Sequence, residues 1–149
     1  MKKILLLITI FILSGCGYSS VYKEINKEEI KISIKSLNGD QILNNLLRTK
    51  LKNFTSSNSN KNYILNINSV FIRSVTSKDK TGRATNVQLI ARIEFDISLN
   101  EIQKNLIYEE KINIENSSNS YEQKNYEKSI KNSFVNSIVN KLILQLTTI

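Results

Sequence analysis

The residue with the clearest chemistry is Cys16, a lone thiol that follows Leu-Ser-Gly at residues 13–15. These residues close a short apolar run that begins after Lys2 and Lys3. A basic start, an apolar segment and small residues at a cleavage site are typical of a secretory signal peptide. The run of about ten apolar residues is shorter than the roughly 20 that span a bilayer as a helix. We therefore predict that residues 1–15 are a signal peptide, cleaved before Cys16.

The position of this cysteine predicts that it carries lipid. A cysteine directly after Leu-Ser-Gly is similar to a bacterial lipobox, the signal at which the cysteine is acylated and begins the mature chain. An intrachain disulfide is excluded because the sequence has no second cysteine. The alternative is an ordinary signal peptide with a stray cysteine at its end. Apart from an acyl or diacylglycerol lipid on Cys16, we expect no cofactor and no metal.

The residue after the cysteine bears on where the lipid anchor is sorted. An aspartate there retains a lipoprotein in the inner membrane of enteric bacteria, whereas this chain has Gly17. We therefore expect an outer-membrane protein, held by its lipid on the periplasmic side.

A second chemical feature is a basic segment between two predicted strands. Four cations fall within it: Arg73, Lys78, Lys80 and Arg83. Arginine binds phosphate as a flat fork and lysine as a point charge, so the segment is a candidate site for the phosphates of an acidic glycolipid. Its one acid is Asp79, and Gly82 can take a positive φ at the turn. The alternative is a solvated hairpin whose charges prevent aggregation through its edges.

Composition excludes several kinds of catalytic site. The chain has no histidine, so it cannot build a Ser-His-Asp triad. Its one cysteine is assigned to lipid, which leaves no thiol nucleophile and no Cys/His zinc site. With only four glycines, the sequence has no Gly-rich phosphate loop. We expect a protein that is not an enzyme.

The net charge of +8 favours anionic partners. For a membrane-anchored envelope protein, the nearest abundant anions are phosphorylated lipids and lipopolysaccharide, so we expect no nucleic-acid binding. A second basic group, formed by Lys124, Lys128 and Lys131, follows helical spacing. We interpret it as a solvated helix face.

Hydrophobic periodicity defines the elements that must position these residues. Alternating apolar residues predict strands near residues 30–35, 63–72, 87–99 and 106–114. Spacings of three and four predict helices over residues 42–54, with Asp40 as N-cap, and from about 121 to 146. Residues 100–105 are predicted to be a turn.

This order predicts an α+β fold with two helices packed on one face of a four-stranded mixed or antiparallel sheet. We expect residues 29–149 to form a single domain and residues 16–28 to form a lipidated tether. One predicted strand changes phase, because its apolar residues move from Tyr63, Leu65 and Ile67 to Val70 and Ile72. A bulge, or burial on both faces, is the expected reason.

Together these features resemble the lipopolysaccharide-assembly lipoprotein family LptE, in its alphaproteobacterial form. The likeness rests on Leu-Ser-Gly-Cys-Gly-Tyr at residues 13–18, on the order of elements and on the hairpin at residues 76–85. It implies a plug inside the outer-membrane β-barrel LptD that assists barrel assembly and lipopolysaccharide delivery. It also implies acylation of Cys16 and contact between the region of Lys78, Lys80 and Arg83 and lipopolysaccharide. The alternative is a structural or adaptor lipoprotein of another envelope machine, such as the one that inserts outer-membrane proteins.

Overall fold

The computed structural model describes residues 30–55, 59 and 61–148. The predicted signal peptide at 1–15, the tether at 16–28 and Cys16 lie outside the described residues. The elements follow in the order β1 (Lys31–Gly39), α2 (Gln41–Leu51), the short 3-10 helix η1 (Lys52–Phe54), β2 (Asn62–Lys78), β3 (Ala84–Leu99), β4 (Ile102–Glu115) and α3 (Ser120–Thr147). This is the predicted order of strand, helix, three strands and helix.

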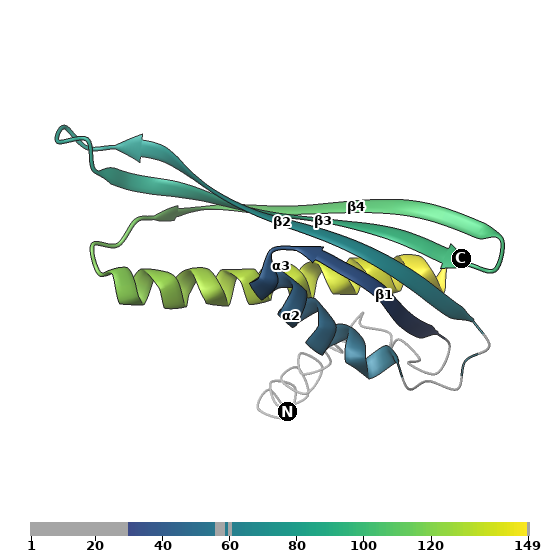
Figure 1. Cartoon of the computed structure of the whole chain (residues 1–149). Helices are drawn as coiled ribbons and strands as arrows, with labels where there is room; N and C mark the ends of the chain where they lie inside the picture. Colours follow the sequence, from purple (N-terminus) through teal and green to yellow (C-terminus); the bar gives the residue numbers. More distant parts are fainter. Residues whose placement is uncertain (1–29, 56–58, 60, 149) are drawn as a thin grey trace, which may run out of the picture.

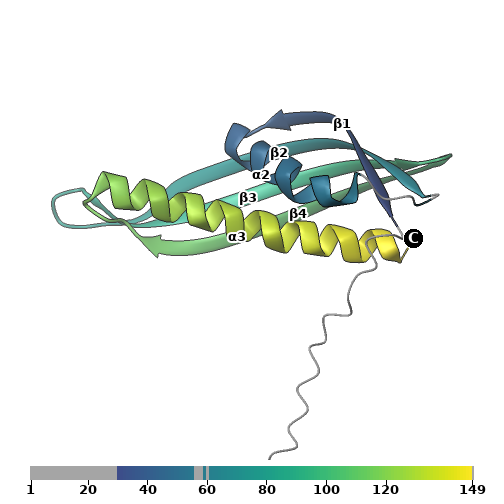
Figure 2. The ribbon, with the colours of Figure 1, turned by 90° about the horizontal axis from the view of Figure 1, so that it is seen from below.

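The strands form one mixed sheet in the order β1-β2-β3-β4. β1 lies parallel to β2, whereas β2, β3 and β4 run antiparallel. The connection through α2 is the crossover that a parallel pair of strands requires. Both helices lie on the same face of the sheet, as Figure 1 and Figure 2 show. The predicted α+β fold is confirmed.

The core lies between the sheet and the helices. β3 contributes every second residue to it, namely Val87, Leu89, Ala91, Ile93, Phe95 and Ile97. α3 contributes an apolar stripe that includes Phe134, Ile138 and Leu142. The ring of Phe95 meets that of Tyr108 edge-on, with centroids 6.1 Å apart. The strand period of two and the helix period of 3.6 thus meet in one apolar layer.

Backbone geometry fixes the corner between β1 and α2. Gly39 has a φ of +98°, and a Cβ at this position would lie 1.8 Å from the carbonyl oxygen of Ser69, so only glycine fits. The next residue, Asp40, caps α2: its Oδ1 accepts a hydrogen bond from the N–H of Leu43 at 2.8 Å. The predicted N-cap is therefore confirmed. β1 continues to Gly39, because it keeps pairing with β2 as far as Ser69.

The predicted turn over residues 100–105 is wrong. β4 begins at Ile102, and the chain reverses within Asn100 and Glu101. Asn100 has a φ of +52°, a left-handed conformation that asparagine tolerates better than most residues. This tight turn frees the polar residues after it to pair as a strand.

The change of phase along β2 has neither of the expected causes. β2 pairs with β3 without a register shift from Ile64 to Val75, so no bulge lies there. Val70 and Ile72 are 42% and 46% exposed, on the face of the sheet opposite the helices, which we call the helix-free face. The buried place between them and Ile67 holds Ser69, whose hydroxyl bonds to Oδ1 of Asn44 at 2.8 Å. The strand therefore alternates regularly, with a polar residue inside and apolar residues outside.

The far ends of β2 and β3 extend beyond the helices. In Figure 1 this hairpin projects past the start of α3 and rises away from it. Residues 76–86 carry no buried side chain, whereas alternate side chains of the same two strands are buried where the helices cover the sheet. Helical cover, rather than strand pairing, decides where the core ends.

Candidate functional site

Asp79 organises the tip of the projecting hairpin. Its Oδ1 accepts hydrogen bonds from the N–H of Thr81 at 2.8 Å, the hydroxyl of Thr81 at 2.7 Å and the N–H of Arg83 at 2.9 Å. Gly82 closes the turn with a φ of +83° and donates its N–H to the carbonyl oxygen of Asp79 at 3.0 Å. One carboxylate therefore holds together the whole turn between β2 and β3.

The same contacts set the charge of this acid. The hydroxyl of Thr81, followed by the N–H of Arg83, stabilises the carboxylate and lowers the pKa of Asp79 below its ordinary value of 3.8. Asp79 is thus ionised near neutral pH, and its Oδ1 is engaged by donors of the turn itself.

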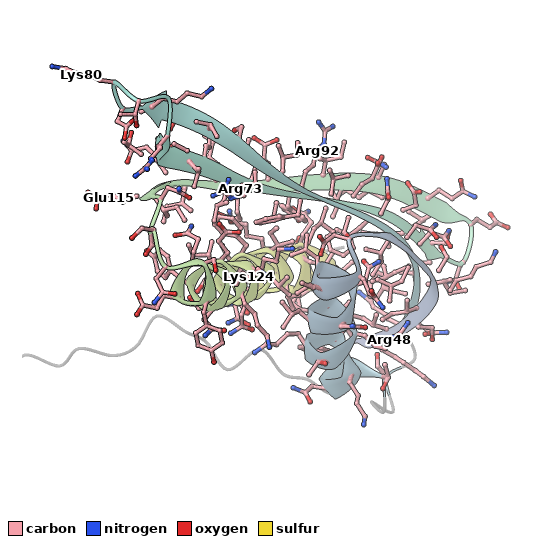
Figure 3. The ribbon with its side chains drawn as sticks, turned by 60° about the vertical axis from the view of Figure 1, so that its left-hand side comes forward. Arg48, Arg73, Lys80, Arg92, Glu115 and Lys124 are labelled. Carbon is pink, nitrogen blue, oxygen red and sulfur yellow. The ribbon has the colours of Figure 1, made fainter. Side chains whose placement is uncertain are left out.

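Three exposed cations surround this turn: Lys78, Lys80 and Arg83. We call them the basic tip. Within the described part of the chain, ion pairs join acids to Arg73, Lys131 and Lys141, and to none of the three. Figure 3 shows Lys80 at the extreme end of the hairpin, directed away from the body. The tip therefore presents uncompensated positive charge that can bind phosphate or another small anion.

The fourth predicted cation, Arg73, belongs to a different environment. It lies on the helix side of β2, about five residues and roughly 17 Å of strand before Lys78. Its Nε donates to Oε1 of Glu127 at 2.9 Å, and its Nη2 donates to Oδ1 of Asn116 at 2.5 Å. The structure thus brings Lys78, Lys80 and Arg83 together, whereas Arg73 ties the base of the hairpin to α3.

The second basic group is also divided. Lys124 and Lys128 are exposed, as predicted for a solvated helix face. Lys131 is only 8% exposed: its Nζ lies 3.0 Å from Oδ2 of Asp40 and 3.9 Å from the centre of the Phe71 ring. The solvated interpretation is wrong for this residue, because α3 places it against the capped corner of α2. Its helical spacing with Phe134 and Val135 was the available signal.

Sequence reasoning also missed the helix-free face of the sheet. Its half-exposed apolar residues are Ile64, Val70, Ile72 and Ile107. Figure 3 shows Arg92 pointing outward from the same face. Arg92 lies opposite Glu109 in the β3–β4 register, so the face mixes apolar and charged groups. The sequence signal for this apolar face was that Val70 and Ile72 are out of phase with Tyr63, Leu65 and Ile67.

Comparison with known proteins establishes the fold. No family model matches the sequence, and no curated protein matches it significantly. Rare lipoprotein B from Shewanella oneidensis has a similar structure, with a TM-score of 0.59, 17% identity and coverage of 80% of this chain and 97% of that one. An uncharacterized lipoprotein B from Nitrosomonas europaea has a TM-score of 0.55 at 12% identity, with coverage of 80% of this chain and 81% of that one. A minor lipoprotein from Acinetobacter baumannii has a TM-score of 0.52 at 15% identity, with coverage of 80% of this chain and 94% of that one. The chain has the fold of these bacterial lipoproteins. None of the helices in the described ranges has the length and apolar character needed to cross a bilayer.

Proposed function

We propose that this chain is a non-enzymatic outer-membrane lipoprotein of the LptE type. Acylated Cys16 holds it on the periplasmic side, its body plugs the LptD barrel and assists barrel assembly, and its basic tip contacts lipopolysaccharide. The observation that carries the proposal is the projecting hairpin, in which three unpaired cations surround one internally bonded acid. The fold that the chain shares with bacterial lipoproteins supports the class.

The proposed contact with lipopolysaccharide follows from charge and reach. Lys78, Lys80 and Arg83 are exposed and supply one guanidinium fork and two ammonium groups to phosphate oxygens. Since none of the three forms an ion pair with an acid in the described residues, an approaching phosphate has no such partner to displace. The hairpin also projects beyond the helices, so a bulky glycolipid can approach it without meeting the body.

A plug must have a surface that is compatible with a water-lined barrel interior. The helix-free face supports the proposal, because Arg92, Glu94, Asp96 and Glu109 lie on it beside the apolar residues. The other face supports the proposal through its exposed lysines on α3, Lys124 and Lys128.

Attachment through Cys16 follows from the leader sequence. Each buried CH2 contributes about 0.8 kcal/mol, and a single acyl chain gives only marginal binding, so stable attachment needs more than one chain. Mass spectrometry of the amino terminus from native membranes tests this. We expect residues 1–15 to be missing and Cys16 to carry lipid; an uncleaved or unmodified terminus contradicts the proposal.

Affinity purification of the full chain from detergent-solubilised envelopes tests the partner. We expect one large barrel, LptD, in stoichiometric amount, and recovery of the chain free of any barrel contradicts the proposal. Depletion then separates the proposed function from its rival. Loss of surface lipopolysaccharide with other barrels intact supports the LptE-type function, whereas a general loss of barrels supports a role in outer-membrane protein insertion.

A further inference from the structure

A cavity of about 310 Å³ lies between β1 and the end of α2, far from the hairpin. Three cations line it, Lys35 from β1 and Arg48 and Lys52 from the helical segment, together with Ile34, Ser36, Leu37 and Thr55. Figure 3 labels Arg48 on α2. Binding sites for small molecules usually enclose about 300–1,000 Å³, so this one fits a headgroup-sized ligand.

The charges of the cavity have no acidic partner among the residues that the structure describes. Within these ranges no acid lines the cavity, and the ion pairs involve other cations. Lys35, Arg48 and Lys52 repel one another across this space, although all three side chains are exposed and water and salt weaken the repulsion. An anion in the cavity would remove that repulsion and gain charge-assisted hydrogen bonds.

A local irregularity of β1 accompanies these charges. The pairing of β1 with β2 skips from Ile34 to Ser36 while β2 advances only from Leu65 to Asn66. Lys35 is the extra residue of this bulge. A bulge bends the strand and re-aims a side chain, and here the re-aimed side chain lines the cavity.

The end of α2 provides an internal reference. Its last turn carries two basic residues, Arg48 and Lys50, and cations are favoured beside the partial negative charge of a helix C-terminus. Only Arg48 of the two lines the cavity. The helix dipole acts on both residues. If replacing Arg48 weakens ligand binding and replacing Lys50 does not, the effect therefore comes from the cavity and not from the dipole.

We infer that the cavity formed by Lys35, Arg48 and Lys52 binds the phosphoryl group of a small phosphorylated ligand. The polar side of the site supplies ammonium and guanidinium groups, and Ile34 and Leu37 supply an apolar floor for a short organic substituent. The shared chemistry is a phosphate ester or free phosphate; the headgroup of an anionic glycerophospholipid and inorganic phosphate are its two sources.

This site is separate from the basic tip. Leu37 pairs with Ile67, and the strand continues for about 11 residues from Ile67 to Lys78, which is roughly 36 Å at 3.3 Å per residue. A headgroup in the cavity therefore cannot touch the tip. The inference also requires neither acylation of Cys16 nor a barrel partner.

NMR of the full chain in a non-ionic detergent tests the inference. Inorganic phosphate is titrated in one arm and phosphatidylglycerol, added to the micelles, in the other; phosphatidylcholine is the zwitterionic control lipid. We expect saturable shifts of the backbone amides of Lys35, Ser36, Leu37 and Lys52 with at least one of the two phosphorylated probes. Binding of phosphatidylglycerol alone assigns the lipid headgroup, and equal binding of phosphate assigns the free anion.

Two variants locate the effect. Arg48→Gln together with Lys52→Gln is expected to weaken binding at least about tenfold, since each removes a charge-assisted contact. Lys50→Gln, on the same turn but outside the cavity, is expected to leave binding unchanged. The inference is overturned if neither probe shifts these amides, if the shifts fall on the basic tip instead, or if Lys50→Gln weakens binding as much as the double variant.

Discussion

The body and the projecting hairpin of this protein share the strands β2 and β3, yet they use their polar groups in opposite ways. Over the helices, buried polar atoms find partners: none of the buried side-chain nitrogens or oxygens in the described residues lacks a hydrogen bond. Lys131 meets Asp40, Glu110 accepts from Ser137 and Lys141, and Tyr63 donates to the carbonyl oxygen of Leu146. At the basic tip, by contrast, Oδ1 of the single acid accepts hydrogen bonds from its own turn, and no acid of the described residues forms an ion pair with the three cations.

The difference shows which residues the fold requires. A paired polar group in the body holds a helix against the sheet, so replacing it costs stability. A cation at the tip supports no core, so replacing it leaves the fold intact and changes only what the hairpin binds. Arg73 marks the boundary, because it is a hairpin residue by sequence and a body residue by its contacts with Glu127 and Asn116.

The largest effect is expected from truncation of the core. Phe95 is fully buried in the centre of β3 and packs against Tyr108. Phe95→Ala should lower the free energy of unfolding by about 3–5 kcal/mol, and Leu89→Ala by about 2–5 kcal/mol, because each leaves a cavity. Denaturant unfolding followed by circular dichroism measures both. A loss below 1 kcal/mol would contradict the assignment of this layer as the core.

Alanine substitutions at two glycines, one in the body and one in the hairpin, compare the stability of the two regions. Gly39 and Gly82 both have a positive φ, so an alanine at either position costs about 1–2 kcal/mol of backbone strain. Only at Gly39 does the new Cβ also meet the carbonyl oxygen of Ser69, which accepts the N–H of Asp40 at 2.9 Å. Loss of that bond adds about 1–3 kcal/mol to Gly39→Ala. Equal destabilisation of the two alanine variants in thermal unfolding would contradict the close approach at the β1–α2 corner.

The ion pair between Lys131 and Asp40 predicts how the stability of the body depends on pH. Burial alone raises the pKa of Asp40, but the N–H of Leu43 and the Lys131 ammonium outweigh it, so the pKa lies below 3.8. A lowered pKa in the folded state means that the carboxylate stabilises the fold fully above its unfolded pKa, and that this contribution is lost as pH falls through the folded pKa.

Lys131→Met should therefore cost about 1–3 kcal/mol at neutral pH and reduce the loss of stability on acidification below pH about 4. Urea unfolding at a series of pH values measures it. Lys128→Met, on the exposed side of α3, is the control and should change stability by less than about 0.5 kcal/mol. An unchanged acid dependence in Lys131→Met would mean that the Asp40 pair does not stabilise the body.

The smallest effect on stability is expected at the basic tip. Replacing Lys78, Lys80 and Arg83 together with alanine removes no buried contact and leaves the hydrogen bonds of Asp79 with the backbone and Thr81 in place. The free energy of unfolding should change by less than about 0.5 kcal/mol per residue. Cooperative loss of the hairpin, seen as rapid amide exchange over residues 74–86, would show that these side chains support the turn.

Sequence patterns predicted what depends on periodicity and local capping. The alternation in β3, the N-cap at Asp40 and the order of elements follow from such rules, and the structure confirms them. The features that could not be predicted depend on how the helices pack on the sheet. The burial of Lys131 depends on α2 packing beside α3, and the exposure of Val70 and Ile72 depends on the absence of a helix from one face.

The candidate site divides in the same way. Charge and a glycine located the hairpin and its cations along the chain, but only the structure separates Arg73 from the tip and shows Asp79 bonded to its own turn. The cavity beside β1 had no sequence signal, because Lys35, Arg48 and Lys52 are brought together by a strand bulge and a helix crossover. Hydrophobic periodicity therefore could not predict which charged residues from distant parts of the chain lie together.

The central claim is that the basic tip recognises an acidic glycolipid and that the exposed lysines of α3 and β4 do not. The direct measurement is binding of detergent-dispersed lipopolysaccharide to the immobilised full chain, at low salt and near 1 M salt. The control variant replaces Lys111, Lys124 and Lys128 with alanine, which removes the same charge from exposed sites on the body. We predict that the tip variant binds at least about tenfold more weakly at low salt, that the control variant binds nearly as well as the unaltered chain, and that 1 M salt, with a screening length of about 3 Å, removes the difference. Equal binding by the two variants at low salt would contradict the claim.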